Sequence, residues 1–408
     1  MRAIIGWAAL ALVVLAVLGI AHEPLFWMHY ALARAHGTDE LPLYYYQPRE
    51  LVPGGNEPPA PYESPASQSL DIGALEAAAH YAGSHHSRAL IISRHGYRVF
   101  ERYWLGSGFD TPIESGALGR VVAALLAGNA IYDRHIGWPD APIGLFITEW
   151  REDPRGSISV RNLLQSASGL IPQPPDANPW SAAADQAYGS NVVARYLRLP
   201  LRAAPGQRWV QQSVDPDLLA VVIQRATHER YAEYLSRTLW RRIGAADAWL
   251  WLDRPGGDVH VDRGFLVRQG DWLRVGELLL QNGRYEGSEV VDPRWVPLLL
   301  RPSKANSDYG SYLRLGAHTA PGMTAYEAAD LFVVQGGGTW LWLIPSLQIA
   351  ILRTGDLPSG MANVGTVANA DVDVWDDARI PNLVLHGTHD FVPTTRPGAG
   401  ISTIVPHH

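Results

Sequence analysis

The spacing of apolar residues predicts strands near both ends of the chain and helices between them. Residues 70–83 carry apolar side chains at helical spacing. An apolar run at 89–93 and an alternating stretch at 97–105 flank His95-Gly96, which predicts two antiparallel strands joined by a tight turn. The folded part of the chain therefore begins with a helix and a strand hairpin.

The middle of the chain follows a mainly helical pattern. Apolar residues recur every three or four positions in the segments 117–131, 160–170, 215–244 and 269–283. Strand patterns return at 330–335, 339–345 and 347–355, with glycines at the first turn. This arrangement predicts an α+β fold, in which an antiparallel sheet lobe is completed by both chain ends and a helical lobe is inserted at about 112–302.

An uncharged run at residues 3–20 predicts a transmembrane helix. Its 18 residues are close to the ~20 that span a bilayer core. Arg2 on the short N-terminal side places that end in the cytoplasm by the positive-inside tendency. We therefore expect a single-pass protein of the inner, cytoplasmic membrane whose folded part faces the periplasm or the exterior. A cleaved signal peptide ending at Ala21 is the alternative.

The remaining divisions follow from composition. Residues 22–68 are rich in Pro, Tyr and Gly without sustained periodicity, which indicates an extended stalk or a wrapping segment. Residues 69–390 form the predicted main domain, and 391–408 a C-terminal tail. The formal net charge of -7 and the lack of a dense Lys/Arg cluster argue against nucleic acid as a partner. With no cysteine, the chain has no disulfide and no thiolate nucleophile.

Several motifs occur in a characteristic order. D-T-P-I-E-S at 110–115 is followed by V-R-N-L-L-Q-S-A-S-G-L at 160–170, an L-L-x-x-x-I-x-R-A-T helix from Leu218, E-Y-L-x-x-x-L-W from Glu233, and three glycines at 336–338 before two strands. This order resembles the serine β-lactamase and penicillin-binding-protein superfamily. Within it, W-L-W-L-D at 249–253 and G-R-Y-E-G at 283–287 resemble the esterase and 6-aminohexanoate-oligomer-hydrolase branch. The resemblance implies a two-lobed β-lactamase/transpeptidase-like fold with a cleft between the lobes.

The resemblance also implies a serine nucleophile at the start of a buried helix, with a lysine one turn later. The matching stretch is E-S-G-A-L-G-R-V-V, so Ala117 stands in the serine position and Arg120 in the lysine position. Alanine has no hydroxyl group to attack a carbonyl. Arginine, whose pKa exceeds ~12, does not accept a proton near neutral pH.

Two further family positions are also changed. A tyrosine followed two residues later by asparagine or serine is implied where Gln211 and Ser213 stand, and glutamine does not ionise. A lysine or histidine two residues before a glycine is implied on the strand at Gly336-Gly337-Gly338, where the cationic residue is missing. Loss of several members of one catalytic set leaves little activity. We expect an inactive relative that binds a small molecule, a peptide or a glycan, or a partner protein, without a cofactor or a metal.

Three alternatives remain open. A relocated serine, Ser115 or Ser213, would give an active esterase or amidohydrolase. An interaction module with a collapsed cleft is expected if Arg120 pairs with a carboxylate beside Ala117. A third reading, an α/β-hydrolase with Asp390 as the acid and His386 or His389 nearby, requires a G-x-S-x-G elbow that the sequence lacks.

Overall fold

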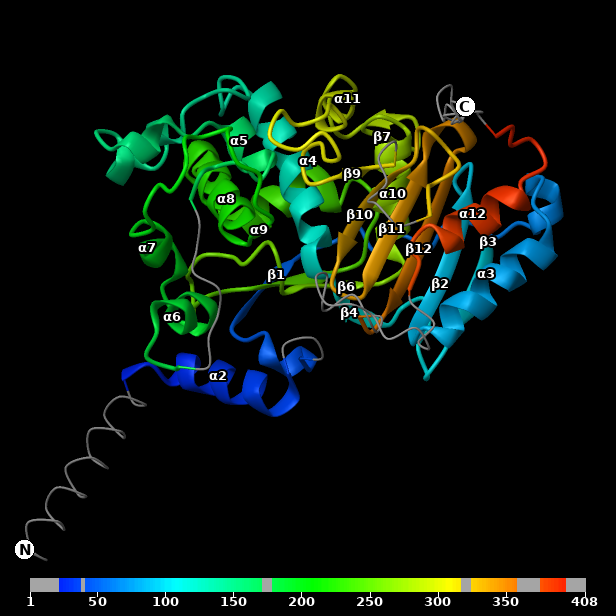
Figure 1. Ribbon diagram of the computed structural model, residues 1–408, viewed down its shortest axis with the longest axis horizontal. Coiled ribbons are helices and arrows are strands. Elements are labelled where there is room, and N and C mark those ends of the chain that lie inside the picture. The colour runs from blue at the N-terminus through cyan, green and yellow to red at the C-terminus, as the bar shows by residue number, and fades with distance from the viewer. Residues whose placement is uncertain (1–21, 38–40, 171–177, 317–323, 358–374, 394–408) are drawn as a thin grey trace, which may run out of the picture.

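A six-stranded antiparallel sheet forms one lobe of the computed structural model, which describes residues 22–37, 41–170, 178–316, 324–357 and 375–393 (Figure 1). The strand order is β3-β2-β12-β11-β10-β9. The strands are β2 (Ser87–Arg94), β3 (Tyr97–Tyr103), β9 (Arg314–Leu315), β10 (Phe332–Gly336), β11 (Thr339–Ile344) and β12 (Ile349–Gly355). Since β2 pairs with β12 across about 260 residues of chain, with Ile91 opposite Leu352, both chain ends complete the sheet as predicted.

Helices cover both faces of this sheet. On one face lie α3 (Ile72–Ser84) and α12 (Arg379–His386), and on the other lies α10 (Asp271–Leu280) (Figure 1). Along β11 the side chains alternate, so that Trp340 and Trp342 join the core under α3 and α12 while Leu341 and Leu343 join the opposite core. Burial on both faces explains why this strand is apolar throughout.

The helical lobe is built around α4 (Gly119–Tyr132), which packs against α8 (Val214–Thr227). The other helices of this lobe are α5 (Val160–Leu164), α6 (Ala182–Tyr188), α7 (Val192–Tyr196), α9 (Tyr231–Leu235) and α11 (Trp295–Leu299). Almost every residue of α4 is buried, and a helix surrounded by protein carries apolar residues on all sides. The predicted α+β arrangement, with a sheet completed by both chain ends, is confirmed.

A second sheet, which the helical pattern of this region did not reveal, lies between the lobes. Its order is β1-β5-β6-β4, and its strands are β1 (Arg49–Val52), β5 (Ala248–Trp251), β6 (Phe265–Arg268) and β4 (Pro112–Glu114). A hairpin of β7 (Arg284–Tyr285) and β8 (Ser288–Glu289) follows α10. Strands of two to four residues are too short for a period of two to stand out in the sequence.

The segment 22–68 wraps around the body. It contains α2 (Pro24–His36), which packs against α6, and β1, which pairs with β5. Pro24 stands in the first turn of α2, where its missing N–H costs no hydrogen bond. The composition of 22–68 allows either an extended stalk or a wrapping segment. The described residues form the wrapping segment.

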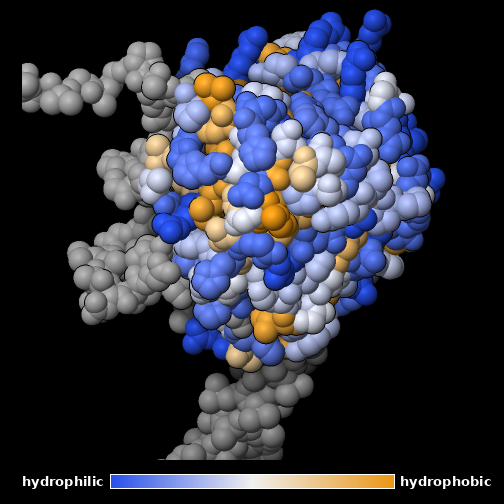
Figure 2. All heavy atoms as spheres, turned by 90° about the vertical axis from the view of Figure 1, so that its right-hand side faces the viewer, coloured by the Kyte–Doolittle hydropathy of each residue, from blue (hydrophilic) through white to orange (hydrophobic). Residues whose placement is uncertain are grey.

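The predicted transmembrane run at 3–20 lies outside the described residues, and so does most of the C-terminal tail. Within the described ranges, no helix has the length and apolar character needed to cross a bilayer. The side of the molecule that carries α3 and α12 is largely hydrophilic toward solvent (Figure 2).

Candidate functional site

Ala117 lies in a 3-10 turn, Gly116–Leu118, that leads directly into α4. One carboxylate oxygen of Glu114 accepts the backbone N–H groups of Gly116 at 2.9 Å and of Gly264 at 2.7 Å, which ties the start of α4 to the loop before β6. Only glycine fits at position 119, because the Cβ atom of any other residue would lie 2.3 Å from the carbonyl oxygen of Val261. The backbone at this helix start is therefore fixed by close contacts.

The glycine at the end of β10 faces Ala117. A Cβ atom on Gly336 would lie 2.1 Å from the backbone nitrogen of Ala117. Strand alternation then places Val334 on the same face as Gly336, while Gly337 forms the turn with φ of 55°. The carbonyl of Gly338 accepts a hydrogen bond from Arg353 at 2.5 Å. From Phe332 to Gly338 the chain contains neither lysine nor histidine.

Arg120 is held by a carboxylate that the sequence pattern did not single out. Its guanidinium Nε donates a hydrogen bond to Asp262, and the other oxygen of Asp262 accepts one from the Ser213 hydroxyl. Burial alone would raise the pKa of Asp262, but Arg120, together with Arg263 and the Ser213 hydroxyl, holds this pKa below its usual value. Burial likewise opposes the charge of Arg120, and Asp262 reverses this effect, so the pKa of Arg120 is raised. Both groups are therefore charged.

The two candidate serines differ in their surroundings. Ser115 is fully buried, and its hydroxyl oxygen accepts a hydrogen bond from the Trp272 indole at 3.2 Å. Ser213 stands at the N-terminus of α8, half-buried, with its hydroxyl on Asp262. A carboxylate with a lowered pKa is a weak proton acceptor, so Asp262 does not activate Ser213.

Gln211 is exposed, and the neighbouring Gln212 points inward instead. The side-chain nitrogen of Gln212 donates to the Leu170 carbonyl at 2.7 Å and to Asp215 at 3.0 Å. The carboxyl group of Asp215 is buried, and burial raises its pKa to about 7. Two acidic residues in the first turn of the predicted helix, Asp215 and Asp217, were the available sequence signal for this cluster.

Tyr312 also lies in this cluster and was not predicted. Burial, followed by the charge of Asp215 nearby, raises the pKa of Tyr312 well above its usual value. Its hydroxyl oxygen is buried and has no hydrogen-bond partner among the described residues. Its φ of 61° is unusual for a residue with a side chain. A tyrosine in an otherwise irregular loop gives no sequence pattern that would mark it.

The C-terminal acid and histidines serve other contacts. Asp390 pairs with the buried Arg94 at 2.5 Å, and His386 lies 2.8 Å from Glu327. Residues 379–386 form a helix where the α/β-hydrolase reading requires a strand. That reading is therefore wrong.

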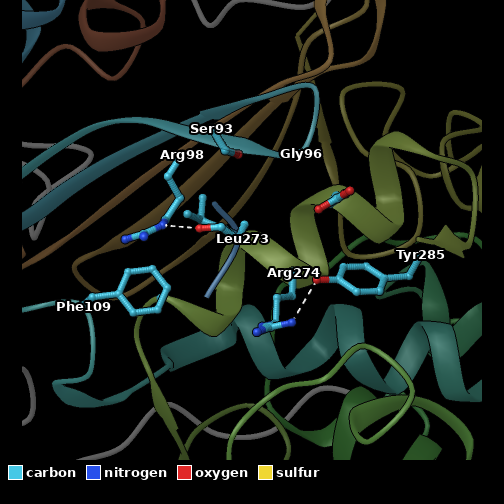
Figure 3. A pocket seen from close by; sticks show the side chains of 10 residues that line it. Ser93, Gly96, Arg98, Phe109, Leu273, Arg274 and Tyr285 are labelled. Carbon is cyan, nitrogen blue, oxygen red and sulfur yellow. Dashed lines mark hydrogen bonds between the residues drawn. The ribbon is translucent and has the colours of Figure 1, made fainter. Parts of the chain in front are cut away.

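A small pocket lies away from Ala117, between α10 and the β2–β3 hairpin (Figure 3). Its volume is about 10 Å³, which is room for one water molecule. Arg274 donates to the Tyr285 hydroxyl at 2.9 Å, and Arg98 donates to the Ala60 carbonyl at 2.7 Å (Figure 3). Arg98, and Arg274 through the carbonyls of Glu57 and Pro58, hold the wrapping segment against the body, so the pocket is structural.

Comparison with known proteins agrees with this fold. The sequence model of the beta-lactamase family matches residues 74–358. The curated 6-aminohexanoate-dimer hydrolase of Paenarthrobacter ureafaciens is 29% identical over 152 residues, which cover 36% of this chain and 38% of that protein. The match therefore spans less than half of the relative.

Solved structures share the fold. A putative 6-aminohexanoate-dimer hydrolase from Bacillus anthracis superposes with a TM-score of 0.65 at 18% identity, covering 78% of this chain and 88% of that one. A putative beta-lactamase from Bacteroides dorei DSM 17855 gives a TM-score of 0.62 at 17% identity, covering 78% and 99%. Because the family model covers well over half of the chain, the protein belongs to the β-lactamase family, as the order of its sequence motifs predicts.

Proposed function

We propose that this protein is a membrane-anchored member of the β-lactamase family that no longer hydrolyses a substrate and acts by binding. The observation that carries the proposal is the buried Arg120–Asp262 pair one turn after Ala117. Acyl transfer by this family requires a hydroxyl nucleophile and a group that accepts its proton. Here a methyl group and a charged guanidinium occupy those positions.

The same pair favours a partner-binding role over a small-ligand pocket beside Ala117. Arg120 is 8% exposed, and Asp262 and Ala117 are each 9% exposed, so little of the surface beside Ala117 is open to a ligand. This arrangement fits an interaction module, in which the cleft is collapsed and the protein recognises a partner. A small molecule, peptide or glycan at the rim of the site is the second form of binding.

The competing function is an active esterase or amidohydrolase that uses Ser213. The observation in its favour is the hydrogen bond from the Ser213 hydroxyl to Asp262. Against it, Arg120 keeps that carboxylate ionised and its pKa low, which weakens it as a base. Ser115 does not offer the same possibility, because it is fully buried.

A labelling experiment separates these functions. The full chain, purified in detergent, is incubated with a fluorescent fluorophosphonate and separately with a fluorescent penicillin. We expect no labelling of the wild-type protein above a heat-denatured control. Stoichiometric labelling would overturn the proposal, and its loss in Ser213→Ala would assign the activity to that serine.

Membrane attachment through residues 3–20 is part of the same proposal. The run is long enough to span a bilayer, and Arg2 favours a periplasmic or extracellular main domain. Flotation with vesicles after carbonate washing tests the attachment. Recovery of the full chain in the soluble fraction would contradict it.

A further inference from the structure

Five aromatic residues gather where α2 meets α6, at the lower edge of the molecule in Figure 1. The rings of Trp27 and Trp180 meet edge to face at 5.1 Å, and Tyr188 lies 6.2 Å from Phe26 and 5.5 Å from Tyr30. We call these five residues the aromatic edge. They come from two segments about 150 residues apart, so folding alone brings them together.

The aromatic edge is partly open to solvent. Trp180 is 74% exposed, and a hollow of about 300 Å³ opens beside Phe26, Trp27 and Trp180. An indole ring combines an apolar body with a polar N–H group, which suits a boundary between water and an apolar phase. In water, the exposed apolar surface of these rings would have no apolar surface to pack against.

Two carboxylates beside the hollow share one arginine, so these three groups carry a net charge of -1. Glu23 and Asp185 both pair with Arg195, at 3.4 Å and 2.6 Å. Paired carboxylates repel an anionic surface less than free ones do. The hollow therefore offers aromatic rings to a neighbouring surface, with a net charge of only -1 from these paired groups.

The course of the chain identifies that surface. His22 lines the hollow, and a single residue separates it from the uncharged run at 3–20. Two residues of extended chain span at most about 7 Å, so the hollow lies within that reach of the end of the run. We infer that the aromatic edge rests in the headgroup region of the membrane that this run crosses, an inference that depends on the proposed anchoring. Trp and Tyr rings favour this depth in membrane proteins.

Because the chain contains no cysteine, single labelling positions are available. Ala31 is exposed on α2, one helical turn after Trp27, and Ala31→Cys keeps every ring of the aromatic edge. Ala77→Cys is the matched control, since Ala77 is also an exposed alanine and lies on α3, a helix of the same length as α2, 13 residues. α3 lies on the far side of the molecule (Figure 1).

Each full-length variant is labelled with an environment-sensitive fluorophore and reconstituted into phosphatidylcholine–phosphatidylglycerol vesicles that contain a nitroxide lipid quencher. We expect a blue-shifted emission and several-fold quenching in Ala31→Cys, and neither change in Ala77→Cys. Adding Trp180→Ser to Ala31→Cys is expected to reduce the quenching.

The outcomes separate this inference from the anchoring. Flotation with the vesicles but no quenching in Ala31→Cys would overturn the inference and leave the anchor standing. A blue shift without lipid quenching would also overturn it, because a second copy of the chain would then cover the edge. Failure of the full chain to float would overturn both the anchoring and the inference.

Discussion

Arg120 and Asp262 form an ion pair in which both residues are more than nine-tenths buried. Asp262→Asn would deprive the buried guanidinium of its hydrogen-bonded carboxylate and leave Asp217 as a more weakly coupled charge nearby. Breaking a buried pair typically costs about 3–5 kcal/mol. We therefore expect a loss of that size in the free energy of unfolding, measured by urea denaturation.

A matched variant shows whether burial of the pair causes this loss in the free energy of unfolding. Asp140→Asn removes one partner of the Arg161–Asp140 pair, which is 2.7 Å long and exposed. Exposed pairs contribute about 0–1 kcal/mol, so this variant should lose little. Equal losses in the two variants would show that the Arg120–Asp262 pair does not stabilise the fold as a buried pair.

Stability should also depend on pH through Asp215. Its folded pKa of about 7 lies above its usual value of 3.8, so the folded protein keeps a proton that the unfolded chain releases. The free energy of unfolding should therefore fall as the pH rises from about 4 to 7, by at most about 4 kcal/mol. Asp215→Asn should flatten this slope in denaturation curves. Part of the slope should remain in this variant, because burial also raises the pKa of Glu114 to about 7.

Sequence patterns and structure agree best where periodicity is long. The helix of 269–283 and the strands around 340 and 350 form where they were predicted, because the helix keeps a helical apolar period and the strands are apolar runs between turn residues. α2 was missed because P-L-F-W-M-H-Y-A-L-A is apolar almost throughout and shows no polar stripe. Asp262 was missed because it meets Arg120 from a loop 142 residues away, and only folding brings that loop to α4.

The close approach of β10 to Ala117 gives another test. A methyl group on Gly336 would lie 2.1 Å from the Ala117 nitrogen, so Gly336→Ala forces one backbone to move. We expect a loss of about 1–3 kcal/mol or more, as for other overpacked sites. Gly137→Ala is the control, since a Cβ atom there meets nothing within 4 Å, and it should be close to neutral. A neutral Gly336→Ala would contradict the contact.

Tyr312→Phe removes a hydroxyl group that is buried without a partner among the described residues. Leaving a buried polar group unsatisfied costs about 1–3 kcal/mol, so this variant should be as stable as the wild type or more stable. Tyr196→Phe is the contrast, because the Tyr196 hydroxyl donates to Asp217 at 2.8 Å, and it should lose stability. Thermal unfolding of both variants distinguishes the two cases, and a clear loss in Tyr312→Phe would show that its hydroxyl has a partner.

Restoring the family's serine alone should not restore reactivity. In Ala117→Ser the new hydroxyl would lie one turn from Arg120, which stays charged beside Asp262 and accepts no proton. Adding Arg120→Lys should still give no fluorophosphonate labelling, since the same carboxylate would keep the lysine protonated. Asp262→Asn as a third change removes that charge, and weak labelling should then emerge. Labelling of the double variant would show that the missing nucleophile and base, rather than Asp262, account for the inactivity.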